Sequence, residues 1–170
     1  SYVSLRLFNV FGPRSRSNKH YGAVIGTFIS QKLNNKPFTI VGDGKQTRDF
    51  VYVADVVKAF YLSYKNKVKN EIINIGLSKP VSVKKLTSLI DKKNKVVYLP
   101  ERPGEPRHIQ SLNFKAKKIL KWKPMYTFEE GIKIVLQNKD YWKKSPIWTK
   151  NKIKKATKNW FKYLSKFKRI

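Results

Sequence analysis

Alternating apolar and polar positions open the chain and predict a strand. Residues 2–11 alternate and are rich in β-forming side chains, and the run stops at Gly12-Pro13, where a loop follows. Apolar residues then recur at helical spacing over residues 21–33, and the polar segment 34–37 ends that helix. A short apolar run at residues 38–41 predicts another strand. The first forty residues therefore indicate the order strand, helix, strand.

The same alternation of strands and helices continues through the middle of the chain. The apolar run at residues 72–76 is typical of a strand that a parallel sheet buries on both faces. Ser82 precedes helical spacing over residues 83–92, so we expect it to cap that helix, and we expect Asp55 to begin a helix that runs to Tyr64. Further extended segments are expected at residues 49–53 and 95–99, with a tight turn at residues 42–44.

Local signals also place the helices of the last third. Residues 113–120 predict a short helix that the segment Trp122-Lys123-Pro124 ends. Thr127 and Glu130 have the spacing of a capping box, in which each residue bonds the other's backbone amide. One long helix is expected over residues 149–167, with lysines on one face. Its other face is an apolar stripe of Ile153, Ala156, Trp160, Leu164 and Phe167.

Composition narrows the class of protein. Of 170 residues, 41% are hydrophobic and 14% aromatic, which is enough to form a core. No apolar run approaches the roughly 20 residues that span a bilayer. The absence of cysteine excludes disulfides, thiolate metal sites and a cysteine nucleophile, and we expect a cytoplasmic protein. His20 and His108 are far apart in sequence, so we expect no metal site.

Basic residues outnumber acidic ones by 38 to 10, for a formal net charge of +28. Such a charge suits nucleic acid or an anionic membrane, but the lysines are spread along the chain, so we favour a solvated basic surface and no specific nucleic-acid partner. Residues 141–170 contain 11 of the 38 basic residues and no Asp or Glu. We therefore divide the chain into a main part, residues 1–140, and a basic amphipathic helical extension, residues 141–170. Its apolar stripe is expected to pack on the domain or on a partner subunit, with membrane contact as the alternative.

Three segments, taken in order, resemble one enzyme family. They are LRLFNVFGPR at residues 5–14, GDGKQTRDFVYVADV at residues 42–56, and RPGE at residues 102–105 followed by LKWKP at residues 120–124. Together they resemble the carboxyl-terminal half of the extended short-chain dehydrogenase/reductase family, the NAD-dependent nucleotide-sugar epimerases and dehydratases. Within that family the chain looks most like a UDP-sugar 4-epimerase.

The resemblance implies an α/β fold with two parts: the last strands of an NAD-binding Rossmann sheet and a small mixed α/β lobe that binds substrate. The family's glycine-rich NAD turn and its catalytic Ser/Thr, Tyr and Lys belong to an amino-terminal half that this sequence lacks. We therefore expect no catalytic residue here, NAD bound mainly by that other half, and no turnover by this chain alone. The full-length enzyme is expected to be a homodimer.

Two segments resemble the NAD-binding loop and the catalytic pair that this sequence lacks. The segment GDGKQT at residues 42–47 begins like a dinucleotide-binding loop but lacks its third glycine and a helix directly after it. Tyr61 and Lys65 have the spacing of the family's catalytic pair, yet they follow the Arg48 motif, whereas the family's pair precedes the first strand of this chain. We interpret both as chance.

The expected ligand is a nucleoside diphosphate sugar, whose two phosphates a protein without a metal neutralises with guanidinium groups. The resemblance assigns that role to Arg48 and Arg102. It also implies that Asn9 bonds a phosphate oxygen and that Glu105 accepts from a ribose hydroxyl.

The resemblance assigns further contacts to backbone groups and apolar side chains. Ala23 and Val24, at the start of a helix, would line the end that offers amides to the phosphates. The backbone of Thr39 and Val41 would face the uracil, and Phe50 would enter the same pocket. The cofactor is expected to lie near Leu7 and Phe8.

These residues also have plain structural interpretations. Arg48 could pair with Asp49 or Asp55, and Arg102 and Glu105 could form a loop ion pair that contributes little. The phenylalanines of the motifs are more often core residues than ligand contacts. The chain also departs from the family pattern: Leu7 replaces a common aromatic residue, and the usual Ala-Asp after the third motif is replaced by Ser111 and Leu112.

We therefore expect the substrate-binding portion of a UDP-sugar 4-epimerase, an enzyme in which NAD takes a hydride from C4 of the sugar and returns it to the other face. Nucleotide-sugar 4,6-dehydration and decarboxylation of UDP-glucuronate are the alternatives within the family. A non-catalytic module that binds UDP-sugars or polyanions is the alternative of a different class.

Overall fold

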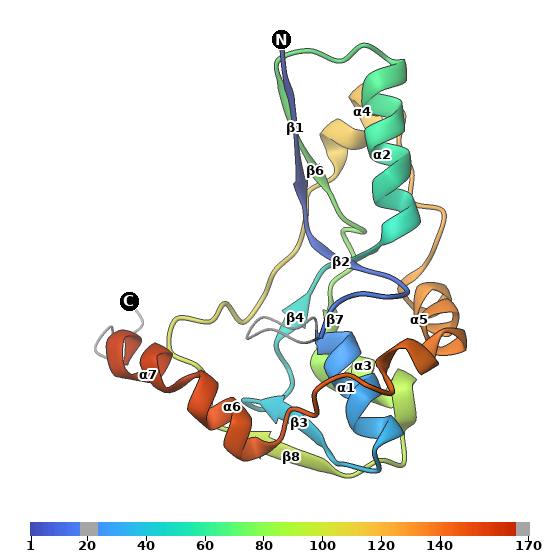
Figure 1. Ribbon diagram of the computed structural model, residues 1–170. Helices are drawn as coiled ribbons and strands as arrows, with labels where there is room; N and C mark the ends of the chain where they lie inside the picture. The colour runs from blue at the N-terminus through green and yellow to red at the C-terminus, as the bar shows by residue number, and fades with distance from the viewer. Residues whose placement is uncertain (18–23, 166–170) are drawn as a thin grey trace. The chain divides into compact units, whose positions relative to one another are not determined.

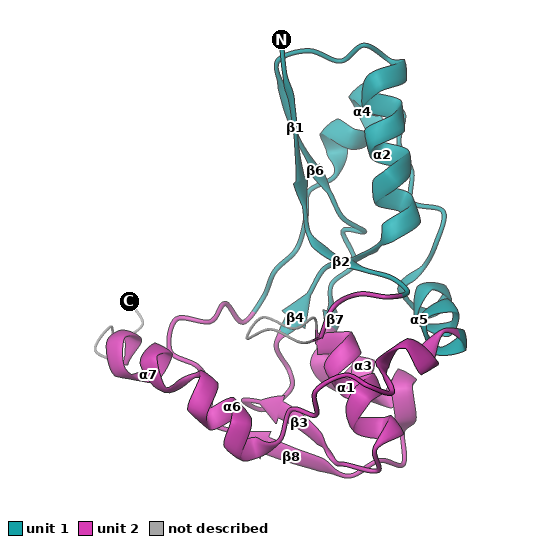
Figure 2. Cartoon of the chain, viewed as in Figure 1, with its two compact units in different colours: residues 1–13, 47–81, 108–137 teal, residues 14–46, 82–107, 138–170 magenta. Residues whose placement is uncertain are grey.

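The computed structural model describes residues 1–17 and 24–165 and shows an α/β chain, as expected (Figure 1). The described chain divides into two compact units, coloured separately in Figure 2. Unit 1 consists of residues 1–13, 47–81 and 108–137, and unit 2 of residues 14–46, 82–107 and 138–170. Two short strands, β4 (Thr47–Arg48) and β7 (Val81–Ser82), lie where the chain passes from one unit to the other.

Unit 1 contains two pairs of parallel strands. Strand β1 (Val3–Leu7) pairs with β6 (Glu71–Ile75), so that Leu7 lies opposite Ile75. Strand β2 (Asn9–Phe11) pairs with β5 (Phe50–Tyr52).

The single strand expected over residues 2–11 is therefore two strands with different partners. The change occurs at Phe8, whose N–H donates to the carbonyl of Ile75 at 3.0 Å. The next N–H, that of Asn9, donates instead to the carbonyl of Asp49, also at 3.0 Å. The alternation of apolar and polar residues does not change at this point, because both strands direct one face toward the core. The alternation therefore does not reveal the change of partner strand.

The core of unit 1 lies between these strands and two helices, α2 (Val53–Lys65) and α4 (Phe114–Leu120), which cover one face of β1 and β6 (Figure 1). Ile73 and Ile75 of β6 are fully buried, whereas Ile72 is 42% exposed. The expectation that this strand is buried on both faces is wrong for the described chain, since helices cover only one face. The buried cluster comprises Val51, Val56, Ala59, Ile73, Ile75, Ala116, Leu120 and Trp122.

Asp55 does not cap helix α2, because the helix begins two residues earlier, at Val53. Its carboxylate is buried and accepts the N–H of Met125 at 2.7 Å and that of Tyr126 at 3.3 Å. Burial raises the pKa of Asp55, and these two backbone hydrogen bonds oppose the shift. The carboxylate therefore fixes the loop that leads into α5 (Phe128–Gln137), whose capping box of Thr127 and Glu130 forms as expected.

Unit 2 is built around the parallel pair β3 (Phe38–Val41) and β8 (Val96–Leu99). Helices α1 (Val24–Leu33) and α3 (Val83–Asp91) contact each other, and the short 3₁₀ helix η1 (Lys139–Trp142) packs on α1. Ser82 accepts the N–H of Lys85 and so caps α3, as the sequence predicts.

The carboxyl-terminal part of unit 2, from residue 138 on, is bonded to the segment that follows β2. The indole N–H of Trp142 donates to the carbonyl of Ser15, and that of Trp148 donates to the carbonyl of Ser17. The single helix expected over residues 149–167 is instead two helices, α6 (Lys150–Ala156) and α7 (Lys158–Leu164). They are separated at Thr157, whose hydroxyl donates to the carbonyl of Ile153. Such back-bonding by a threonine is known to bend helices.

Phe167, the last member of the expected stripe, lies outside the described residues. Within the described ranges, no helix combines the length and the apolar character needed to cross a membrane.

Candidate functional site

The edge of strand β3 carries two of the positions expected to bind a base. The N–H groups of Phe38 and Gly42 donate to carbonyls of β8 and of the residue before it, so Thr39 and Val41 turn their backbone groups the other way. Side chains meet those groups: the Thr39 N–H donates to Oε1 of Gln31 at 3.3 Å, and the Val41 carbonyl accepts from Nε2 of Gln46 at 2.6 Å.

Gln31 joins three segments of unit 2. It is fully buried, and its Nε2 donates to the hydroxyl of Thr39 and to the carbonyl of Trp148, both at 2.7 Å. Its position on α1 thus connects the edge of β3 to the carboxyl-terminal segment.

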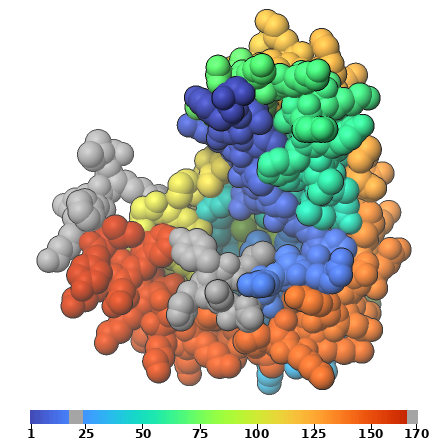
Figure 3. All heavy atoms as spheres, turned by 45° about the horizontal axis from the view of Figure 1, so that its top comes forward, coloured from blue at the N-terminus to red at the C-terminus, as the bar shows by residue number. Residues whose placement is uncertain are grey.

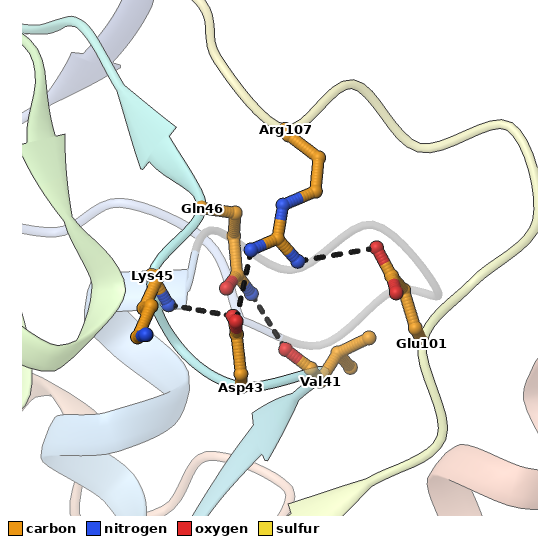
Figure 4. A network of polar contacts seen from close by, with 6 residues as sticks. All are labelled: Val41, Asp43, Lys45, Gln46, Glu101 and Arg107. Carbon is orange, nitrogen blue, oxygen red and sulfur yellow. Dashed lines mark hydrogen bonds and ion pairs between the residues drawn. The ribbon is translucent and has the colours of Figure 1, made fainter.

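A glycine turn follows β3, as the sequence predicts. Gly42 and Gly44 have φ values of +67° and +75°, a region that side chains with a Cβ rarely adopt. Between them, Asp43 accepts the N–H of Lys45 at 2.9 Å and Nη2 of Arg107 at 2.8 Å (Figure 4). Arg107 also reaches Glu101 at 3.4 Å, so the turn is tied to the loop of residues 100–107.

The charges of this network act on one another. The hydrogen bond from Arg107, and then that from the Lys45 amide, holds the pKa of Asp43 below its ordinary value. The same carboxylate, with a smaller contribution from Glu101, raises the pKa of the Arg107 guanidinium. The network fixes the loop that carries the third motif.

Arg102 and Glu105 lie on that loop and form the expected ion pair, with Nη1 and Oε2 3.8 Å apart. The Arg102 guanidinium lies 5.7 Å from the ring centroid of Trp160, within the range of a cation–π contact. Among the residues that the structure describes, the buried Nε of Arg102 finds no hydrogen-bond partner. No local pattern indicates Trp160 as a neighbour of this loop, because it lies 57 positions after Pro103, the residue to whose carbonyl its indole N–H donates.

A cavity of about 640 Å³ opens beside Arg102 in unit 2. One wall is Val41, Leu99, Pro100 and Arg102, and the other comes from α6, α7 and the residue between them. Among the described residues that line the cavity, none is acidic and five are basic: Arg102, Lys150, Lys154, Lys155 and Lys158. The surface that faces the cavity is mostly apolar, and the basic residues place positive charge around it, an arrangement that suits an anionic ligand with an apolar or aromatic part.

Unit 1 positions the other expected substrate residues. Asn9 is exposed at the start of β2 and lies opposite Phe50 of β5. Arg48 immediately precedes Asp49 and donates from Nη1 to the carbonyl of Thr47 at 2.9 Å. Phe50 is 2% exposed and its ring stacks on that of Phe128, with 4.9 Å between the ring centroids. The Phe50 side chain therefore belongs to the core of unit 1.

Asp49 is the residue of the second motif that sequence reasoning missed. It is completely buried, and Oδ1 accepts the N–H of Leu77 at 2.9 Å. Oδ2 accepts the N–H groups of Ser78 at 2.9 Å and Ser111 at 2.8 Å, and the Ser111 hydroxyl at 2.5 Å. Ser111, which departs from the family pattern, thus supplies two of the four bonds. Gly76 lies so close that an added Cβ would come within 2.4 Å of the Ser111 hydroxyl oxygen.

The remaining expected positions lie at the ends of elements. Leu7 ends β1 and is 42% exposed, and Phe8 follows it at the carboxyl end of that strand, where parallel sheets bind ligands. Val24 is the first described residue of α1, and Ala23 lies outside the described residues. Tyr61 and Lys65 are exposed on α2, where the ammonium lies 6.0 Å from the ring centroid.

Comparison with known proteins decides the family. The profile of the NAD dependent epimerase/dehydratase family matches residues 1–76. A putative UDP-glucose 4-epimerase of Methanocaldococcus jannaschii is 42% identical over 139 residues, which is 79% of this chain and 44% of that protein. This chain belongs to the NAD-dependent epimerase/dehydratase family.

Solved structures of family members have the same fold. UDP-N-acetylglucosamine 4-epimerase from Methanobrevibacter ruminantium, in complex with UDP-N-acetylmuramic acid, is 39% identical with a TM-score of 0.75. UDP-glucuronic acid 4-epimerase from Bacillus cereus, in complex with UDP-glucuronic acid and NAD, is 31% identical with a TM-score of 0.70. Each match covers 81% of this chain and 45% of the other. The chain thus spans less than half the length of the family members it matches.

Proposed function

We propose that this chain is the substrate-binding portion of an NAD-dependent UDP-sugar 4-epimerase and corresponds to the carboxyl-terminal half of that enzyme. The observation that carries the proposal is the mostly apolar cavity of unit 2, with basic residues among those that line it. Val41 and Arg102, which the resemblance assigns to the base and to the diphosphate, line the same space. Its volume of about 640 Å³ falls in the range of small-molecule and cofactor sites.

Each side chain has a definite task in this proposal. Arg102 presents a planar guanidinium to the diphosphate, and Glu105, 3.8 Å away, accepts from a ribose hydroxyl. For Asn9 and Arg48, which belong to unit 1, the role of phosphate donor rests on the family resemblance alone. Binding of the nucleotide, which does not react, orients the sugar that does.

NAD is the cofactor of the family, and the residues of this chain are suited to contact only part of it. Leu7, exposed at the carboxyl end of β1, and Phe8 after it offer apolar contact to the cofactor. The sequence holds no glycine-rich turn that leads into a helix and could hold the cofactor's diphosphate. When bound, NAD supplies the hydride acceptor and donor, and we propose that the other half of the enzyme holds most of it.

Isothermal titration with UDP tests the nucleotide site. Arg102→Ala is expected to weaken UDP binding by about 10- to 100-fold, because charge-assisted hydrogen bonds to phosphate are lost. Arg6→Ala is the matched control: this arginine is exposed on β1 of unit 1 and is not among the residues that line the cavity, and we expect a change of less than about twofold. The nucleotide site is wrong if UDP does not bind or if both variants bind it like the parent.

The reaction can be identified by measuring turnover with the protein in the form that the cell produces. Conversion of UDP-glucose to its C4 epimer supports the proposal, whereas release of CO₂ from UDP-glucuronate or loss of water from the sugar would assign one of the alternatives. A protein that binds UDP-sugars without turning them over would be a binding module. Tighter binding to DNA or to anionic vesicles than to UDP would favour the polyanion-binding alternative.

A further inference from the structure

We infer that the carboxyl-terminal helices α6 and α7 are part of the nucleotide site, and that Trp160 is a positioning residue for Arg102. The inference rests on the proposed function, because it concerns the same cavity. It gives a defined role to a segment whose apolar stripe the sequence predicts only to pack on the domain or on a partner subunit.

Trp160 contacts the third motif in two ways. Its indole N–H donates to the carbonyl of Pro103 at 2.7 Å, a short and well-formed bond. Its ring lies against the guanidinium of the neighbouring Arg102, with 5.7 Å between the guanidinium carbon and the ring centroid. One side chain thus holds both the backbone of the loop and the charged group that the loop presents.

The helices also form a wall of the cavity. Lys150, Ile153 and Lys154 of α6 and Phe161 of α7 line it, opposite the wall formed by Val41, Leu99, Pro100 and Arg102. Figure 3 shows this segment, in red, as a continuous part of the molecular surface. Without these helices the cavity would lose one of its two walls.

The physical effect of Trp160 is to preorganise Arg102. A free arginine side chain samples many rotamers, and ordering it on binding costs affinity. Here Glu105 lies 3.8 Å away on one side and the indole ring provides a second contact, so the guanidinium is held at the cavity before a ligand arrives. Because the electron-rich face of the ring attracts a cation without accepting its N–H groups, those donors stay available for phosphate.

Two substitutions separate the contributions of Trp160. Trp160→Phe keeps an aromatic ring but loses the indole N–H, and we expect UDP to bind roughly fivefold more weakly. Trp160→Ala loses the ring as well and should weaken binding by about tenfold or more. Uridine lacks phosphates, so its affinity should change by less than about twofold in both variants, which a general loss of structure would not allow.

Two control variants test whether the effect on UDP binding depends on the position of Trp160. Tyr163→Ala removes an aromatic side chain that is 61% exposed on the same helix and should leave UDP affinity unchanged. Trp142→Phe removes another indole N–H bond of the carboxyl-terminal segment, to Ser15, and should lower the melting temperature without changing the ratio of UDP to uridine affinity.

A double-mutant cycle completes the experiment. If Trp160 acts through Arg102, then Trp160→Phe should have almost no further effect on UDP binding in an Arg102→Ala background. UDP binding that depends on Arg102 but is unchanged in both Trp160 variants would overturn this inference and leave the proposed function intact. Equal losses for UDP and uridine would also overturn it. Failure of the parent protein to bind UDP would instead refute the proposed function.

Discussion

The buried carboxylate of Asp49 gives the strongest quantitative prediction for unit 1. Within residues 1–17 and 24–165 it accepts four hydrogen bonds, three from backbone N–H groups and one from the Ser111 hydroxyl. In Asp49→Asn, the amide can direct its oxygen toward Ser78 and Ser111, but its NH₂ group then faces the Leu77 N–H. One backbone donor is left buried without an acceptor, and the other bonds lose the assistance of the negative charge.

The size of the effect follows from these losses. A buried donor without a partner costs about 1–3 kcal/mol, and neutral hydrogen bonds are about half as strong as charge-assisted ones. We therefore expect the free energy of unfolding to fall by about 2–4 kcal/mol. With a urea dependence of about 2 kcal/mol per molar, the midpoint of unfolding should fall by about 1–2 M.

Urea unfolding followed by circular dichroism measures this shift, and amide hydrogen exchange localises it. Exchange should accelerate at Leu77, Ser78 and Ser111. The matched control is Glu71→Gln, the same chemical change in an ion pair with Lys115 whose side chains are 32% and 54% exposed, where we expect less than about 0.5 kcal/mol. The reasoning is refuted if the two variants unfold at the same midpoint and the three amides stay protected in Asp49→Asn.

Three further predictions concern single features of the fold. Gly76→Ala should lower the free energy of unfolding by about 1–3 kcal/mol in a urea titration, because its Cβ would overlap Ser111; an unchanged midpoint would contradict this. Asp43 should titrate below its ordinary pKa in a carbon NMR titration, so the stability that it contributes is present above the ordinary pKa and is lost as the pH falls through the lowered one. In Arg107→Ala its midpoint should rise toward the ordinary value, and no rise would show that another group sets the shift. Thr127→Ala removes the capping box of α5 and should cost about 1 kcal/mol by thermal unfolding, whereas a change below a few tenths would show that the cap contributes little.

Features that depend on neighbouring residues were predictable. The caps at Ser82 and Thr127 each involve an amide three residues away. The turn after β3 needs left-handed backbone at Gly42 and Gly44, which glycine adopts without strain. Most helices and strands lie within a few residues of their expected bounds for the same reason: their signals are local.

Features that depend on distant segments were not predictable. Asp55 is of a residue type that often caps helices. Its carboxylate instead accepts from the backbone amides of Met125 and Tyr126, which are 70 and 71 residues away. The change of partner at Phe8 depends on which strands lie beside it, and the expected helix over residues 149–167 is divided at Thr157. Periodicity reports which side of an element is apolar but not what lies against it.

The same distinction between local and distant features applies to the candidate site. The sequence by itself determined the family resemblance, the α/β order of elements, and Arg48, Arg102 and Glu105 as candidates for binding a nucleotide sugar. Only the tertiary structure decided that Asp49 is a buried acceptor, that Gln31 and Gln46 meet the edge of β3, and that Trp160 reaches the Arg102 loop. The physical reason is that the burial of a side chain and the identity of its partners are set when segments remote in sequence pack together, and no local spacing encodes that packing.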